Sequence, residues 1–283
     1  MGRTEFVLSN GVKIPAVGFG TWDVRDNAGR GIIADAVRAG YRYFDTASFY
    51  DNEEIVGAAL RDTGIKREEV QIASKIWLTE LGYDEAKAAF ERSVGRLETE
   101  YLDVYLIHWP RRNPIDPIWK DRIRDTWRAM EELYTCGKIK AIGLSNFLPH
   151  HLDVILESAT VKPMIDQLEL HPGYMQIPAV EYCKSNGVVV QAWSPLGRAE
   201  LLKNEYIAKM AERYDVSSAR MILAFLNDQD IAVIPKSSTY ERMVDNLNIF
   251  DVKLNAEDES ILKCLPPMGW SGEHPDLDSK VKE

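Results

Sequence analysis

Residues 139–169, with the sequence IKAIGLSNFLPHHLDVILESATVKPMIDQLE, contain the unit that repeats along this chain. A short apolar run, IKAIGLS (139–145), is followed by a helical stretch that starts near His150 and then by a second apolar run, PMIDQLE (163–169). Short apolar runs separated by helical segments are typical of buried parallel strands joined by crossover helices. This stretch therefore predicts a strand, a helix and a second parallel strand.

The same alternation continues from one end of the chain to the other. Amphipathic stretches such as NAGRGIIADAVRAG (27–40) and DEAKAAFERSVGRLE (84–98) lie between the apolar runs. A spacing of about 30 residues between eight such runs favours closure into a (β/α)8 TIM barrel, an α/β fold, over an open sheet. The predicted strands span residues 16–20, 41–45, 70–75, 102–108, 139–145, 163–169, 188–194 and 231–236.

Three further elements are expected outside the repeating units. FVLSNGVKI (6–14) places Asn10 and Gly11 between two alternating runs, which predicts an N-terminal β-hairpin with a type I′ turn below the barrel. Two extra helices are expected at 217–228 and 256–265, and the polar segment 265–283 is expected to fold as a loop over one barrel face. Because no linker or low-complexity tract interrupts the chain, we expect a single domain over residues 1–283.

Composition and charge limit the partners and the compartment. The formal net charge of -10 argues against nucleic acid or an anionic membrane, because binding phosphates requires clustered positive charge. The first residues lack the layout of a signal peptide, and no apolar run approaches the roughly 20 residues of a membrane span. Cys136, Cys183 and Cys264 have no CxxC spacing, which favours reduced thiols. We therefore expect a cytoplasmic protein without nucleic-acid or membrane partners.

Polar residues close most of the predicted strands. In a (β/α)8 barrel the carboxyl ends of the strands meet at one mouth, where active sites are built. Tyr50 follows the second strand, in the loop before a helix that is expected to start at Asn52. The residues that close the strands are Asp45, Lys75, His108, Ser145, Asn146, Gln167, Trp193 and Lys236.

The side chains of Asp45, Tyr50, Lys75 and His108 form a candidate proton-donating group. A lysine beside a tyrosine is expected to lower the pKa of the phenol, because the positive charge favours the tyrosinate. Asp45 would hold Lys75 charged and oriented, while His108 would donate a hydrogen bond to a carbonyl oxygen. Since no serine or cysteine nucleophile accompanies them, the set points to carbonyl reduction if a hydride donor is present. An aldolase or isomerase that uses Lys75 as a Schiff-base amine is the alternative.

The chain closely resembles the aldo-keto reductases, and within them the bacterial branch that includes the 2,5-diketo-gluconate reductases. The resemblance extends from about Phe6 to Pro275. It is carried by the motifs GFGTW (18–22), GYRYFDTASFYDNE (40–53), LDVYLIHWP (102–110), GLSNF (143–147), DQLELHP (166–172), WSPLG (193–197) and IPKSSTYERMVDN (234–246).

The resemblance implies a reductase of aldehydes or ketones, such as keto sugars or α-keto aldehydes, that acts as a monomer. It also implies that Asp45, Tyr50, Lys75 and His108 are the catalytic tetrad. A barrel that binds NADP(H) without turnover, as a regulatory or structural protein, is the alternative. The implied cofactor contacts are Ser145, Asn146 and Gln167 around the nicotinamide, Trp193 stacked on it, Ser194 and Leu196 along the pyrophosphate, Lys236, Ser237 and Arg242 at the 2′-phosphate, and Asn246 at the adenine.

The residues themselves support NADPH as the cofactor. GFGTWD lacks the third glycine of a GxGxxG fingerprint, so a Rossmann site is not expected. Lys236 and Arg242 follow the last strand, where barrels commonly bind phosphate, and their charges suit a 2′-phosphate better than a ribose hydroxyl. The sequence departs from the family pattern at Trp193, which is often Tyr, and at Asp245, which is often Glu.

The remaining expectations concern substrate and metal. Trp22, Trp77 and Trp109 each follow a strand end and are expected to form an apolar rim for a small carbonyl substrate. Arg111 and Arg112 would favour carboxylate-bearing substrates if they face the mouth. No metal site is expected, because the adjacent residues His150 and His151 are predicted to point to different faces of a helix.

Overall fold

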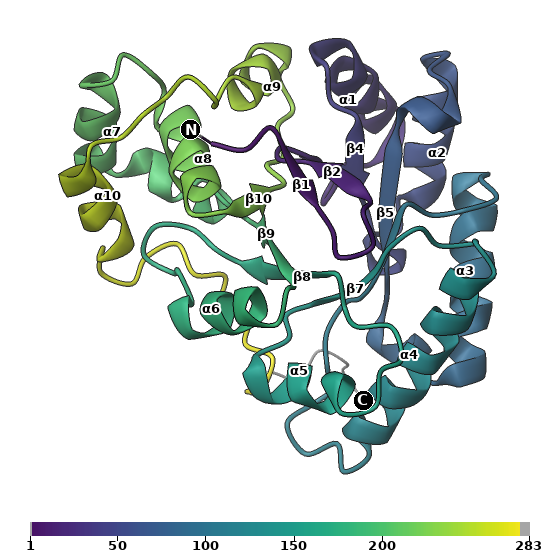
Figure 1. Cartoon of the computed structure of the whole chain (residues 1–283). Helices are drawn as coiled ribbons and strands as arrows, with labels where there is room; N and C mark the ends of the chain where they lie inside the picture. The colour runs from purple at the N-terminus through teal and green to yellow at the C-terminus, as the bar shows by residue number, and fades with distance from the viewer. Residues whose placement is uncertain (1, 278–283) are drawn as a thin grey trace.

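The computed structural model describes residues 2–277, and its parallel strands form the barrel that the sequence predicts (Figure 1). Eight strands lie side by side in the order β10, β9, β8, β7, β6, β5, β4, β3, so that strands adjacent along the chain are also adjacent in the sheet. The strands are β3 (Phe19–Gly20), β4 (Tyr43–Asp45), β5 (Gln71–Ile76), β6 (Val104–Ile107), β7 (Ile142–Ser145), β8 (Ile165–Glu169), β9 (Val189–Trp193) and β10 (Ile231–Val233).

Backbone hydrogen bonds between the first and last strands close the sheet into a barrel. Val17 forms a parallel bridge with Val233. Gly18 N donates to Val233 O at 2.8 Å, and Val233 N donates to Ala16 O at 2.8 Å. Gly20 N donates to Pro235 O at 3.1 Å, which continues the contact toward the mouth. The last strand is shorter than predicted because Pro235 has no N–H group with which to extend the ladder.

Ten α-helices of the described residues surround or flank this sheet, and Figure 1 shows them on its outer side. The crossover from β9 to β10 contains two of them, and two more follow β10. The helices are α1 (Asp26–Ala39), α2 (Glu53–Asp62), α3 (Tyr83–Leu97), α4 (Trp119–Thr135), α5 (Pro149–Leu156), α6 (Ile177–Ser185), α7 (Glu205–Glu212), α8 (Ser218–Asp228), α9 (Tyr240–Leu247) and α10 (Ala256–Lys263).

The two extra helices are confirmed as α8 and α10, and α7 is a helix that the sequence pattern did not predict. Its start is marked by Asn204, whose Oδ1 accepts hydrogen bonds from the backbone N–H groups of Tyr206 and Ile207. Such an N-cap satisfies two of the free amides of the first turn. Asn204 was therefore the local signal for α7, because a helix of this length shows little periodicity.

The N-terminal hairpin is present, but its turn differs from the expected type I′ geometry. Strands β1 (Glu5–Val7) and β2 (Lys13–Pro15) pair antiparallel. Gly11 N donates to Leu8 O, and of the two central turn residues only Gly11 has a positive φ, at 85°. Asn10 instead uses its side chain, whose Nδ2 donates to Lys140 O at 2.9 Å. This tertiary contact holds the hairpin against the amino end of β7 and favours a longer turn closed by glycine.

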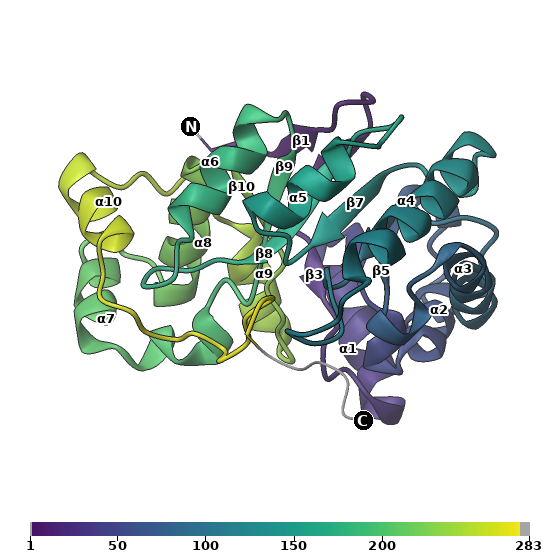
Figure 2. The same cartoon turned by 90° about the horizontal axis from the view of Figure 1, so that it is seen from below.

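The two ends of the barrel carry different covers. Phe6, Leu8 and Ile14 of the hairpin are buried against the end where the strands begin. Figure 2 shows the hairpin on one side of the sheet and the segment after α10, coloured yellow, on the other. The expected loop over residues 265–283 is described up to Leu277, and its remainder lies outside the described residues. Among the described helices, none has the length and apolar character needed to cross a bilayer.

One buried acid lies between the sheet and its outer helices. Asp166 on β8 is fully buried, and Cys183 Sγ on α6 donates to its Oδ2 at 3.6 Å. Its other oxygen, Oδ1, has no hydrogen-bond partner among residues 2–277. Burial raises the pKa of Asp166 to about 8, so this carboxyl is largely protonated in the folded chain at neutral pH.

Replacing Asp166 by asparagine is expected to stabilise the protein increasingly as pH rises. The unfolded carboxyl loses its proton near the ordinary pKa of 3.8, whereas the folded one keeps it to about pH 8. Folding stability therefore falls between these values by up to about 1.4 kcal/mol per pH unit. Urea unfolding of Asp166→Asn at pH 5 and pH 8 should show the larger gain over the parent at pH 8. The exposed Asp121→Asn is the control, and an equal gain at both pH values would contradict the assignment.

Candidate active site

A buried lysine and carboxylate lie at the carboxyl ends of neighbouring strands. Lys75 is the penultimate residue of β5 and is fully buried, and Asp45 is the last residue of β4. Lys75 Nζ donates to Asp45 Oδ1 at 2.5 Å, to Thr46 O at 2.9 Å and to Tyr50 Oη at 3.3 Å. An ammonium group has three N–H donors, so these three contacts account for all of them. The structure thus places the predicted aspartate, lysine and tyrosine in one group.

The loop after β4 fixes the position of Tyr50. Residues Ser48–Tyr50 form a short 3-10 helix, η1. Ser48 Oγ donates to Glu80 Oε2 at 2.7 Å, and the buried Asn52 donates through Nδ2 to Thr21 O at 2.7 Å. Asn52 Oδ1 also accepts from Thr46 Oγ1 at 2.6 Å. These contacts hold both ends of the loop, so the tyrosine ring is presented to the mouth by a rigid turn. Sequence reasoning treated Asn52 only as a helix start.

His108 lies beside Tyr50 within a group of aromatic rings. Its ring centre is 5.6 Å from that of Tyr50 and 5.1 Å from that of Trp77, both in edge-to-face arrangements. Only 7% of the His108 surface is exposed. The fourth member of the predicted set therefore borders the same small volume as the Tyr50 phenol.

The pKa of Tyr50 departs from the sequence expectation. Burial raises the pKa of the phenol, the charge of Lys75 lowers it, and the charges of Asp45 and Glu273 raise it again, so that the net pKa lies above 10.0. The expected lowering by Lys75 is present but is outweighed in the free protein. For Lys75 itself, burial lowers the pKa, but Asp45 and Tyr50 more than compensate and the net pKa is raised. The pair therefore consists of a protonated phenol and a charged ammonium group.

An aromatic wall borders this volume, and it includes a residue that sequence reasoning missed. The ring of Phe49 stacks on Trp77 with centres 3.8 Å apart and lies nearly parallel to Trp22, 6.0 Å away. Trp22 and Phe49 are about half exposed. Trp109 is only 4% exposed, so it is buried more deeply than Trp22 and Phe49. Phe49 precedes Tyr50 directly, and this adjacency was its only sequence signal.

The predicted nicotinamide contacts lie together at the ends of β7, β8 and β9. Ser145 Oγ donates to Gln167 O at 2.9 Å, and Asn146 Nδ2 donates to His108 O at 3.0 Å. Trp193 Nε1 donates to Asn146 Oδ1 at 2.8 Å, which fixes the plane of the indole. Gln167 Nε2 donates to Asp45 Oδ2 at 2.8 Å, so this group is directly joined to the Asp45 and Lys75 pair.

The predicted phosphate and adenine contacts lie in the loops after β9 and β10 and on α9. Ser194 has a positive φ of 47°, and Leu196 lies in the same turn. Lys236 and Arg242 are exposed, and within residues 2–277 neither forms an ion pair. Ser237 and Asn246 are buried beside them. The basic pair therefore has its charge available to a ligand at this end of the mouth.

The segment after α10 is held against the mouth by polar contacts. Ser271 donates through its backbone N and its Oγ to the buried Glu169 carboxylate, at 2.8 and 2.6 Å. Glu273 forms an ion pair with Arg198 at 2.8 Å. Arg111 forms an ion pair with Asp276 at 2.6 Å, and Arg112 donates to Leu78 O at 2.9 Å. The two loop arginines are therefore engaged within the protein, which the sequence could not reveal.

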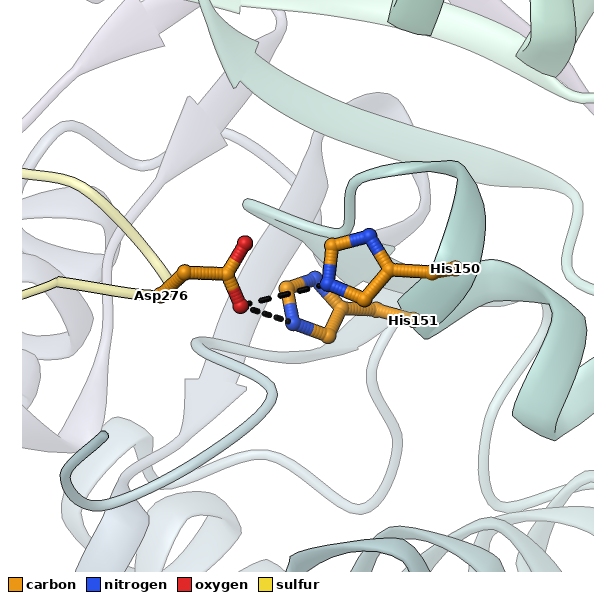
Figure 3. Close-up of side chains that lie close together, drawn as sticks. All are labelled: His150, His151 and Asp276. Atoms are coloured by element: carbon orange, nitrogen blue, oxygen red, sulfur yellow. Dashed lines mark hydrogen bonds and ion pairs between the residues drawn. The ribbon is translucent and has the colours of Figure 1, made fainter. Parts of the chain in front are cut away.

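The predicted orientation of His150 and His151 toward different faces of a helix is wrong. Both rings point to the same acceptor (Figure 3). The Nε2 atoms of His150 and His151 lie 3.2 and 3.0 Å from Asp276 Oδ1. The backbone N of Leu148 donates to His151 Nδ1 at 3.2 Å, so the His151 proton resides on Nε2. Metal binding at Nε2 would require this proton to move to Nδ1, which would break the hydrogen bond from Leu148. Burial lowers the pKa of His151 to about 3, and the cluster fastens the C-terminal segment to α5.

The comparisons decide the family. The family model described as "Aldo/keto reductase family" matches residues 16–265. The chain belongs to this family. This aldo-keto reductase is 43% identical over 270 residues to the glyoxal reductase of Bacillus subtilis (strain 168). The aligned region covers 95% of each of the two chains. The 2,5-diketo-gluconate branch stays a prediction.

Solved structures agree with the family assignment. A crystal structure of an aldo-keto reductase from a Medee basin deep-sea metagenome library superimposes with a TM-score of 0.89 at 36% identity, covering 99% of this chain and all of the other. An aldo-keto reductase crystallised in complex with NADPH gives a TM-score of 0.87 at 29% identity, covering 100% and 95% of the two chains. The (β/α)8 fold is thus shared with aldo-keto reductases of solved structure, and this chain is an oxidoreductase by family.

Proposed function

We propose that this aldo-keto reductase uses NADPH to reduce aldehydes or ketones, with Tyr50 as the proton donor. The observation that carries the proposal is the buried Lys75 ammonium, which contacts both Asp45 and the Tyr50 phenol at the barrel mouth. The names of the similar proteins, a glyoxal reductase and a reductase complexed with NADPH, support the same reaction. We expect small aldehydes and α-keto aldehydes to be substrates, with keto sugars as further candidates.

The residues at the mouth fit the proposed cofactor. Both N–H groups of the Gln167 amide are engaged, at Asp45 and at Gln191, so its Oε1 is the atom left to accept from a carboxamide. The Trp193 plane offers a stacking surface, while Lys236 and Arg242 would hold the 2′-phosphate. When bound, NADPH would supply the hydride.

The protein residues would complete the reaction around the carbonyl group. The His108 ring would direct the carbonyl oxygen toward Tyr50, and the Tyr50 phenol would release its proton to that oxygen. Lys75 would stabilise the tyrosinate that results, because its charge lies 3.3 Å from the phenol oxygen. Asp45 would keep Lys75 in position and charged. Trp22, Phe49 and Trp77 would exclude water from one side of the substrate.

The Schiff-base alternative is disfavoured by the state of Lys75. A nucleophilic amine must lose a proton, but the raised pKa of Lys75 and its three acceptor contacts keep it charged. The remaining alternative is a barrel that binds NADP(H) without turnover. Continuous consumption of NADPH with a panel of aldehydes, α-keto aldehydes and keto sugars would support the reductase. Binding of NADPH without consumption by any of them would support the alternative.

We also propose, from the sequence, a single-domain monomer that works in the cytoplasm. The three cysteines are unpaired, as reduced thiols would be. Gel filtration with light scattering would test the monomer.

Carboxylate-bearing substrates are expected to bind no better than their neutral analogues. The charge of Arg111 is already paired with Asp276, that of Arg198 is paired with Glu273, and the charge of Glu273 acts on Tyr50. An anionic substrate would therefore meet Arg111 and Arg198 with their charges already paired within residues 2–277. KM values for a neutral keto sugar and its carboxylate-bearing analogue, measured at low salt, should favour the neutral compound. A lower KM for the carboxylate that disappears with salt would contradict this reading.

A further inference from the structure

Gln191 is a buried polar residue inside the barrel that the proposed reaction does not use. It lies in the middle of β9, directly beside Gln167 of β8 in the parallel register. Its side chain is fully buried, and its Oε1 accepts a hydrogen bond from Gln167 Nε2 at 2.8 Å. Its own Nε2 interacts with the buried hydroxyl of Tyr43 but forms no hydrogen bond of regular length and angle among residues 2–277. A buried N–H group without a regular hydrogen bond costs stability, so an apolar residue would suit this position better for folding alone.

The charge of Asp45 fixes the orientation of both amides. Asp45 can only accept hydrogen bonds, so the Gln167 atom 2.8 Å from Asp45 Oδ2 must be its nitrogen. The same nitrogen lies 2.8 Å from Gln191, whose facing atom must then be the oxygen. A continuous row of hydrogen bonds thus runs from Gln191 through Gln167 and Asp45 to Lys75. Its direction follows from hydrogen-bond chemistry alone.

We propose that Gln191 is a positioning residue that locks the Gln167 amide, with its nitrogen toward Asp45 and its oxygen toward the nicotinamide. The inference rests on the proposed binding of a nicotinamide at Gln167. Without the Gln191 oxygen, one N–H group of Gln167 loses its acceptor, and the amide is free to rotate away from Asp45. Both the cofactor contact and the second hydrogen bond to Asp45 would then weaken.

Two substitutions separate positioning from packing. Gln191→Met keeps the length of the side chain and removes the acceptor. Gln191→Glu keeps an acceptor oxygen, and the buried site would favour the neutral carboxyl. Gln191→Met removes a Gln191 nitrogen that lacks a regular hydrogen bond, and it leaves one N–H of Gln167 without its acceptor. The stability of this variant is therefore expected to stay close to that of the parent.

Ligand binding and hydrogen exchange together test the proposal. By fluorescence titration, Gln191→Met should bind NADPH about tenfold more weakly than the parent, and Gln191→Glu should recover most of that loss. Adenosine 2′,5′-bisphosphate lacks the nicotinamide. Both variants should therefore bind it with the same affinity as the parent. Without any ligand, the Gln167 side-chain amide should exchange its hydrogens faster in Gln191→Met than in the parent or in Gln191→Glu.

The outcomes distinguish this inference from the proposed function. Failure of the parent to bind NADPH would refute the proposed function, and the exchange measurement would still decide whether Gln191 holds Gln167. Unchanged exchange in Gln191→Met, or an equal loss of affinity for NADPH and for the bisphosphate, would overturn the positioning role of Gln191. Slow exchange in the parent, lost in Gln191→Met and restored in Gln191→Glu, is the expected result.

Discussion

Replacing Tyr50 by phenylalanine is expected to slow carbonyl reduction by roughly 10² to 10⁴-fold or more, while leaving the binding of NADPH intact. The change removes one oxygen and keeps the ring, so the edge-to-face contacts of Tyr50 with Trp22 and His108 can persist. Under the proposed mechanism, the variant would lose the proton that the Tyr50 phenol donates to the carbonyl oxygen. Stopped-flow measurement of a single turnover would separate this chemical step from binding.

Lys75→Met should affect the same step, because the tyrosinate would lose its neighbouring charge. Tyr206→Phe is the matched control, since Tyr206 is half exposed on α7. The pH profile gives an independent check, because only protonated Tyr50 can donate. As the pKa of Tyr50 is raised above 10.0, kcat/KM for reduction should stay level through neutral pH and fall only as pH passes that raised value. A Tyr50→Phe protein that reduces aldehydes at the parent rate would refute the assignment of Tyr50.

The double change Lys236→Ala and Arg242→Ala is expected to weaken NADPH binding by at least about a hundredfold. Each charge-assisted hydrogen bond to a phosphate contributes roughly 1.5 to 3 kcal/mol, and the two side chains have no competing ion pair among residues 2–277. The affinity for NADH should change little, because NADH lacks the 2′-phosphate. Isothermal titration with both cofactors would measure the difference.

Lys66→Ala provides a control for lost positive charge, since this exposed lysine lies before β5 at the opposite end of the barrel. It should leave both affinities unchanged. If the double variant bound NADPH as tightly as the parent, the 2′-phosphate would have to bind elsewhere. The preference for NADPH over NADH would then need another cause.

The sequence predicted the barrel and the central group because both depend on local pattern. Alternating apolar runs specify the strands, and strand ends converge at one mouth in any such barrel. That is why the sequence alone predicts Asp45, Lys75 and His108 near Tyr50. The register of β4, β5 and β6 then sets the distances between the side chains of Asp45, Lys75 and His108.

Features that depend on contacts between distant segments could not be predicted. The orientation of His150 and His151 is decided by Asp276, and the pairing of Arg111 is decided by the same residue. The net pKa of Tyr50 depends on how deeply the ring is buried, which residue spacing does not reveal. Gln191 was overlooked because a polar residue within an apolar strand has no partner in the local sequence.

Transfer of deuterium from NADPH to a carbonyl carbon tests the central claim most directly. The protein would be mixed with an α-keto aldehyde and NADPH that carries deuterium at the transferable position of the nicotinamide, and the product would be analysed by mass spectrometry and NMR. We predict an alcohol with one deuterium on the former carbonyl carbon, formed by the parent and nearly absent with Tyr50→Phe. Failure to form the alcohol with any carbonyl compound, or an alcohol without deuterium, would contradict the account.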